Sequence, residues 1–124
     1  MTQTLAQASS SSDTLLDGAD PSPLYSPYTL SGVDLRNRFV MAPMTRSFSP
    51  GGIPGGDVVD YYRRRARHLG LIVTEGTYVG HPSAGSSDRV PRIYGEDALA
   101  GWKRVVDAVH AEGGRIFPQL WHLG

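Results

Sequence analysis

Polar side chains and a glycine stand where three apolar stretches of the chain end. These residues are Thr45 and Arg46 after the first stretch, Glu75 and Gly76 after the second, and Gln119, Trp121 and His122 in and after the third. We expect each stretch to be a buried strand of a parallel sheet, because continuous apolar runs are typical of such strands. Ligands of parallel α/β folds bind at the carboxyl ends of the strands, so these residues predict one ligand-binding rim.

Two of these residues suggest the shape of the ligand. Gln119 is a carboxamide inside an apolar strand, and a buried amide without partners costs about 1–3 kcal/mol. Either a ligand or neighbouring backbone must therefore bind it, and the residue alone favours neither. Gly76 has no side chain, so it could admit a flat ligand at close range or simply form a turn. Together with the Thr45 hydroxyl, these residues would suit a flat ligand on this rim, and both alternatives stay open at this point.

Other kinds of site find little support. No glycine turn follows the first strand, as a dinucleotide fingerprint requires, and the glycine pairs at 51–52 and 55–56 lack the lysine of a phosphate loop. The four histidines have no i,i+4 spacing, so no metal site is expected. Arg63, Arg64 and Arg67 are read as a solvated helix face in preference to an anion site.

Composition sets further bounds. The 124 residues carry a formal net charge of zero and no cysteine. Zero net charge favours neither a nucleic acid nor an anionic membrane as partner, and the lack of cysteine excludes disulfides and thiolate ligands. No apolar run reaches the roughly 20 residues of a membrane span, and no signal peptide is recognisable, so the expected location is the cytoplasm.

The chain divides into a tail and one domain. Residues 1–23 are rich in serine and polar residues, which predicts a disordered N-terminal tail. Residues 24–37 predict a β-hairpin that turns at Ser31-Gly32. A strand over 38–43 follows, covered on both faces, with Pro43 at its end, and then a loop over 47–56 that is rich in glycine and proline.

Two helices are expected between the remaining strands. The first runs over 57–68, with Asp57 as its cap and Gly70 as a left-handed stop. The second opens at Glu96 and ends at Gly113. The predicted buried stripes are Val58, Tyr61, Tyr62, Ala66 and Leu69 in the first helix and Leu99, Trp102, Val105, Val106 and Val109 in the second.

The other strands are expected over 71–75 and 115–121, with an irregular loop over 77–94. Strands that alternate with helices in this way predict an α/β fold with parallel, right-handed connections. Either a doubly wound sheet or part of a (β/α)₈ barrel satisfies this order.

Several motifs in register resemble the old yellow enzyme family of flavin-dependent ene-reductases. They are Asn37-Arg38-Phe39-Val40-Met41-Ala42-Pro43-Met44-Thr45-Arg46, Tyr61-Tyr62 with Arg65-Ala66, Thr74-Glu75-Gly76-Thr77-Tyr78 and Gln119-Leu120-Trp121-His122. The resemblance covers residues 24–124 and implies the first three strands and two helices of a (β/α)₈ TIM barrel, with the hairpin closing its amino-terminal face. It also implies bound FMN and NADH or NADPH as the hydride donor.

The resemblance further implies roles for individual residues. Ala42, Pro43, Met44, Thr45, Gly76 and Gln119 would bind FMN, and Trp121 and Tyr78 would face a small activated alkene of the enone type. The family's catalytic tyrosine and its His/His or His/Asn pair have no match up to Gly124, so no catalytic residue is expected here. We expect the N-terminal part of such an oxidoreductase, inactive in isolation.

Two alternatives remain open. The chain could be half of a split barrel, an interaction module that folds with a separate C-terminal chain or with a second copy of itself. It could also be an inactive remnant without a ligand. Three strands cannot close an eight-stranded barrel, so exposed sheet edges are expected in each case.

Overall fold

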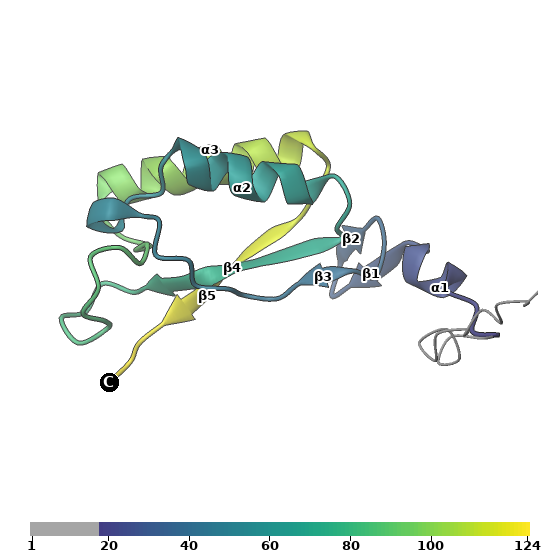
Figure 1. Cartoon of the computed structure of the whole chain (residues 1–124), viewed down its shortest axis with the longest axis horizontal. Helices are drawn as coiled ribbons and strands as arrows, with labels where there is room; N and C mark the ends of the chain where they lie inside the picture. The colour runs from purple at the N-terminus through teal and green to yellow at the C-terminus, as the bar shows by residue number, and fades with distance from the viewer. Residues whose placement is uncertain (1–17) are drawn as a thin grey trace, which may run out of the picture.

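The structure of the protein is a computed structural model, and it describes the placement of residues 18–124. A three-stranded parallel sheet in the order β3-β4-β5 has α2 and α3 on one face (Figure 1). The elements are α1 (Ser22–Tyr25), β1 (Tyr28–Leu30), β2 (Val33–Leu35), β3 (Val40–Met41), the 3₁₀ turn η2 (Pro50–Gly52), α2 (Gly56–Ala66), β4 (Leu71–Tyr78), α3 (Glu96–Ala111) and β5 (Ile116–Trp121). The predicted strand–helix order and parallel pairing are confirmed. None of the helices in this range is long and apolar enough to span a membrane.

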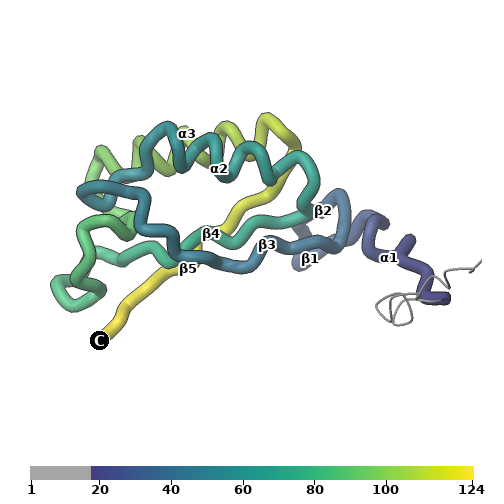
Figure 2. The backbone as a smooth tube through the Cα atoms, in the orientation of Figure 1, coloured from purple at the N-terminus to yellow at the C-terminus, as the bar shows by residue number. Residues whose placement is uncertain are grey.

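The predicted hairpin is confirmed. β1 and β2 pair antiparallel from Tyr28 opposite Leu35 to Leu30 opposite Val33. The turn residues Ser31 and Gly32 have φ values of 48° and 84°, and two positive φ angles are what a tight two-residue hairpin turn needs. The hairpin lies at the end of the sheet where β3 and β4 begin (Figure 2).

Little of the predicted tail can be compared with the structure. Residues 1–17 lie outside the described part of the chain, so the prediction of disorder there stays a prediction. The short helix α1 begins at Ser22, just inside the predicted tail boundary.

The first predicted strand is too long. Only Val40 and Met41 pair with β4, opposite Leu71 and Ile72. Pro43 has no N–H to donate, and β3 is an edge strand of this sheet, so the ladder stops early. The expectation that both faces of this strand are covered is also wrong, because Val40 is 51% exposed.

The second predicted strand is too short. β4 continues to Tyr78, and Gly76 lies inside it opposite Gln119, so the reading of Gly76 as a turn is wrong. One extra residue of β4 is accommodated between Val73 and Gly76, a β-bulge. The Thr74 hydroxyl accepts the Gln119 backbone N–H at 3.1 Å, which satisfies a donor that the bulge displaces from the ladder.

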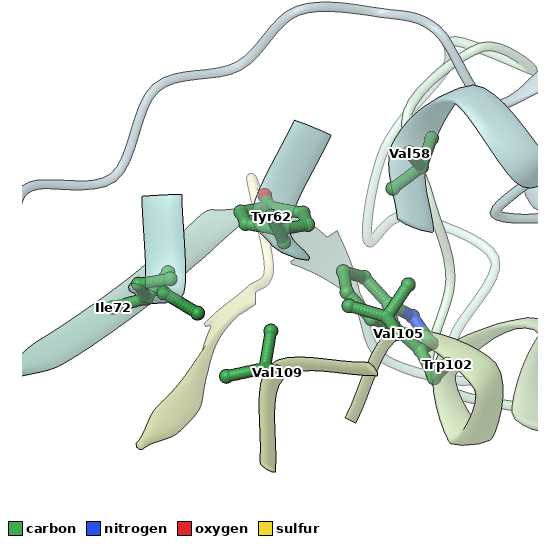
Figure 3. Close-up of a cluster of buried hydrophobic side chains, with 7 residues drawn as sticks. Val58, Tyr62, Ile72, Trp102, Val105 and Val109 are labelled. Atoms are coloured by element: carbon green, nitrogen blue, oxygen red, sulfur yellow. The ribbon is translucent and has the colours of Figure 1, made fainter. Parts of the chain in front are cut away.

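The core lies between the two helices and the sheet (Figure 3). Its fully buried members are Val58, Tyr62, Ala66, Ile72, Trp102, Val105 and Val109. The predicted stripe of the first helix is confirmed, with Tyr61 and Leu69 packed at the margin of the core. In α3 the prediction is wrong for Leu99, which is 48% exposed, because Ala98 and Gly101 take the buried positions at the start of that helix.

Helix boundaries depart from expectation at α2 more than at α3. Gly55, and not Asp57, is the N-cap of α2, and Asp57 lies in the first turn. Gly70 has no positive φ, so it is not a left-handed stop, and α2 ends at Ala66. α3 opens at Glu96 as predicted and ends at Ala111, two residues before Gly113, which has a φ of 73°.

The arginines of α2 tie the two helices together. Arg67 donates to Glu112 at 2.9 Å, and Arg63 contacts the same carboxylate at 3.5 Å. The hydrogen bond from Arg67 lowers the pKa of Glu112 below its ordinary value. Two of the three arginines thus pair with a carboxylate of the chain itself, as expected of a solvated face.

Candidate functional site

The carboxyl end of the sheet is organised by a buried ion pair. The Arg46 guanidinium donates to Glu75 Oε1 at 2.8 Å, and the Arg46 backbone N–H donates to Oε2 at 3.2 Å. The Glu75 side chain has no exposed surface, and that of Arg46 is 11% exposed. Both residues were expected at the rim, but their pairing was not. It joins the segment after β3, which contains Thr45, to β4.

A tyrosine of α2 completes this network. The Glu75 backbone N–H donates to the Tyr62 hydroxyl at 2.9 Å, and that hydroxyl lies 3.4 Å from Glu75 Oε1. Burial raises the pKa of Tyr62 well above its ordinary value, so the hydroxyl stays protonated and can donate to the carboxylate. The sequence placed Tyr62 only in the helix stripe, and periodicity carries no sign of its polar contact.

Aromatic rings pack on the guanidinium of Arg46. Its carbon lies 3.6 Å from the centroid of the Tyr61 ring, and the Tyr62 and Phe48 rings lie within 5.7 Å. Rings stacked on a cation replace part of its lost hydration. Arg46 is therefore fixed by charge and by packing, and the backbone that precedes it has little freedom at this point.

Gly76 accepts a flat ring in this structure, and the ring belongs to Trp121. An ideal Cβ on Gly76 would lie 2.0 Å from the indole, so any side chain here would displace it. The Tyr78 and Trp121 rings lie 6.2 Å apart at an angle of 48°. The sequence predicted a flat ligand at Gly76, but here the chain's own indole lies beside it and accounts for the glycine, so the ligand stays a prediction.

Gln119 lies on the face of the sheet away from the helices. Ile116 and Pro118 line a cavity of about 70 Å³ beneath α3 with Thr74, Trp102 and others. Side chains alternate along a strand, so Gln119 and Trp121 belong to the opposite face. The carboxamide of Gln119 makes no side-chain hydrogen bond to any residue in 18–124, although the residue is half-buried. The alternative that neighbouring backbone satisfies it finds no support in the described residues.

The segment that the sequence assigned to a flavin is exposed. Ala42, Pro43 and Thr45 are solvent-accessible, and Met44 is 61% exposed. They follow β3 directly, on the rim where Gly76 pairs with Gln119. The six residues proposed for FMN thus lie in or just after the carboxyl halves of β3, β4 and β5, and their role in binding FMN stays a prediction.

The loop after β4 forms the other wall of the rim. Tyr78 is 8% exposed and borders a cavity of about 320 Å³ with Arg92, Tyr94 and the loop residues 85–88. His122, which the sequence placed at the end of the third strand, meets His81 from this loop. Their spacing along the chain carried no signal of this contact.

Comparison with known proteins identifies the class. The family model for NADH:flavin oxidoreductase / NADH oxidase matches residues 23–124, and the chain belongs to this family. Its fold is accordingly part of a (β/α)₈ barrel preceded by a hairpin, and the doubly wound alternative is wrong.

Individual relatives are similar over the same region. 12-Oxophytodienoate reductase 7 of rice (Oryza sativa subsp. japonica) is 47% identical over 102 residues, covering 82% of this chain and 26% of that protein. Morphinone reductase in complex with tetrahydroNAD superposes with a TM-score of 0.76 at 46% identity, covering 82% and 27%. An old yellow enzyme from Pichia gives 0.75 at 35% identity. The chain thus spans about a quarter of the length of these relatives.

The residues present fit a flavin. The carboxamide of Gln119 is half-buried and makes no hydrogen bond within residues 18–124, so its donor and acceptor are free for the polar edge of a flat heterocycle. Thr45, in the segment after β3, offers an exposed hydroxyl as a second donor.

Proposed function

We propose that residues 24–124 form the N-terminal part of an FMN-binding barrel domain that reduces activated alkenes with NADH or NADPH. The proposed FMN residues are Ala42, Pro43, Met44, Thr45, Gly76 and Gln119. Support comes from the family match and from one observation above all, the half-buried Gln119 carboxamide that makes no hydrogen bond within residues 18–124. The relatives' names give 12-oxophytodienoate and morphinone as their substrates, which suggests an enone for this chain.

In this proposal FMN, when bound, supplies hydride transfer from the nicotinamide to the alkene. The carboxamide of Gln119 donates to and accepts from the polar edge of the flavin, and the Thr45 hydroxyl donates near its redox end. The ion pair of Arg46 with Glu75 holds Thr45 in place. Trp121 and Tyr78 form an aromatic wall that excludes water from the substrate side.

FMN binding is expected to depend on Gln119. We expect Gln119→Leu to weaken FMN binding by about tenfold or more, because loss of a good paired contact costs about 1–3 kcal/mol. The measurement is quenching of flavin fluorescence on titration with the chain. Lys103→Ala, on the exposed face of α3, is the control and should bind like the wild type. Equal affinity for the Gln119→Leu variant and the wild type would contradict the proposed role of the carboxamide.

A second candidate function is an interaction module, half of a split barrel. Its support is the exposed apolar surface of the sheet, where Val40 is 51%, Phe117 43% and Leu120 57% exposed. Both β3 and β5 are edge strands in the described part of the chain.

Co-expression tests this second candidate. The chain, produced with the C-terminal half of a family barrel, should give a soluble yellow complex of one copy of each on size exclusion. A symmetric complex of the chain with itself would instead favour the homo-oligomer. Recovery of the two halves as separate species would count against the module.

A further inference from the structure

Two histidines that are far apart in the sequence lie with their rings in contact. His81 belongs to the loop after β4 and His122 follows β5, and their ring centroids are 4.9 Å apart. His122 Nε2 lies 3.1 Å from His81 Nδ1. The Ser83 hydroxyl lies 3.0 Å from that same Nδ1 and 3.5 Å from the same Nε2. Three donor atoms thus form a small triangle on an exposed part of the surface.

The backbone holds both histidines in this arrangement. Val79 N–H donates to the carbonyl of Trp121 at 3.2 Å, and Leu123 N–H donates to that of Ala84 at 3.2 Å. These two bonds bracket His81 on one segment and His122 on the other. Within the loop, Ala84 N–H donates to the His81 carbonyl at 3.0 Å and closes a turn. The imidazoles are therefore brought together by the fold and do not depend on their own contact.

We propose that His81 Nδ1 and His122 Nε2 chelate a divalent transition ion, with Ser83 beside it. The geometry matches this use. Two nitrogens bound to Zn²⁺ at about 2.0–2.1 Å in tetrahedral geometry lie about 3.3 Å apart, close to the 3.1 Å between these two atoms. The edges to the Ser83 hydroxyl, 3.0 and 3.5 Å, fall in the same range. The inference does not rest on the proposed flavin function.

When the ion binds, the hydrogen that lies between the two facing ring nitrogens must leave that position. Without metal, one of the facing nitrogens must donate to the other. With metal, both present lone pairs, and His122 carries its hydrogen on Nδ1. In the structure that atom accepts the Gly124 N–H at 3.2 Å, and His81 Nδ1 accepts the Ser83 N–H at 3.3 Å, so both amides must turn away from the ion-bound rings. Gly124 is exposed, so its amide can turn to water at little cost.

The donor set selects the class of ion. Imidazole nitrogen suits Zn²⁺, Ni²⁺ and Cu²⁺, whereas Mg²⁺ and Ca²⁺ prefer oxygen ligands. Within residues 18–124 no group of three or more histidine, cysteine or acidic side chains is placed to hold an ion, so the proposed site has two imidazole ligands and no third side chain of these types. Water would complete the coordination, and the affinity should be well below that of a structural zinc site.

Titration calorimetry with ZnCl₂ on the untagged chain tests the proposal. We expect one zinc ion per chain and no heat with MgCl₂. Loss of either imidazole, in His81→Ala or His122→Ala, should weaken zinc binding by about tenfold or more, since even outer-shell changes cost 10–100-fold. His68→Ala and His110→Ala remove an exposed histidine elsewhere and should stay within about twofold of the wild type.

A second measurement on the wild type does not depend on the variants folding. In NMR spectra the imidazole signals of His81 and His122 should shift with zinc, while those of His68 and His110 stay in place. Absence of zinc binding by the folded wild type would overturn the proposal. So would equal effects of the variants at all four histidines, since zinc would then bind at isolated surface side chains.

Discussion

Replacing Glu75 by alanine is expected to lower the free energy of unfolding by about 3–5 kcal/mol. Removing one partner of a buried ion pair leaves the other charge without compensation, which is the source of this cost. Arg46, whose side chain is 11% exposed in the structure, would have no carboxylate beside it. The Tyr62 hydroxyl and the Arg46 backbone N–H would lose the same acceptor. Urea denaturation followed by tryptophan fluorescence measures the change.

Two further variants separate charge from shape at this site. Asp107→Ala also removes a carboxylate from an ion pair, but that pair, with Lys103, has side chains 60% and 75% exposed. Its loss should cost about 0–1 kcal/mol. The double variant Arg46→Met with Glu75→Met should recover much of the stability, because apolar replacement of a whole buried pair is often neutral. If Glu75→Ala is no worse than Asp107→Ala, the pair does not hold the rim together.

Gly70→Ala is expected to cost about 2–3 kcal/mol. An ideal Cβ at this position would lie 2.1 Å from the carbonyl oxygen of Asn37, and backbone cannot move aside as a side chain does. Gly70 N–H also donates to the carbonyl of Phe39 at 3.0 Å, so the two segments are held at this distance. The strain falls where β3 and β4 begin. The same denaturation experiment should show a lower midpoint.

Gly56→Ala is the matched control for this substitution. Gly56 opens α2, and a Cβ there would meet nothing within 4 Å. Alanine should therefore be neutral or stabilise by about 0.4–1 kcal/mol, chiefly by restricting the unfolded chain. Equal losses for both glycines would show that close contact with Asn37 does not limit position 70.

Local pattern accounts for the elements that the sequence predicted well. The hairpin turn needs two positive φ angles, and Ser31-Gly32 supplies residues that reach them. The stripes of α2 and α3 follow from helical periodicity, except that Leu99 is exposed and Val106 is only half-buried. The errors in strand length have a different origin. β3 is short because only two of its residues pair with β4, and β4 is long because it pairs with β5 as far as Tyr78.

The sequence alone determined the α/β order, the family resemblance and the expectation that Thr45, Gly76 and Gln119 stand near the carboxyl ends of their strands. These follow from the order of elements and motifs along the chain, which needs no tertiary contact to be recognised. Only the tertiary structure decided the contacts across the rim. Arg46 and Glu75 are 29 residues apart, and His81 and His122 are 41 apart. Residues so far apart follow no periodic pattern along the chain that could reveal their contact. They meet because neighbouring strands pair and because the loop after β4 packs against the end of β5.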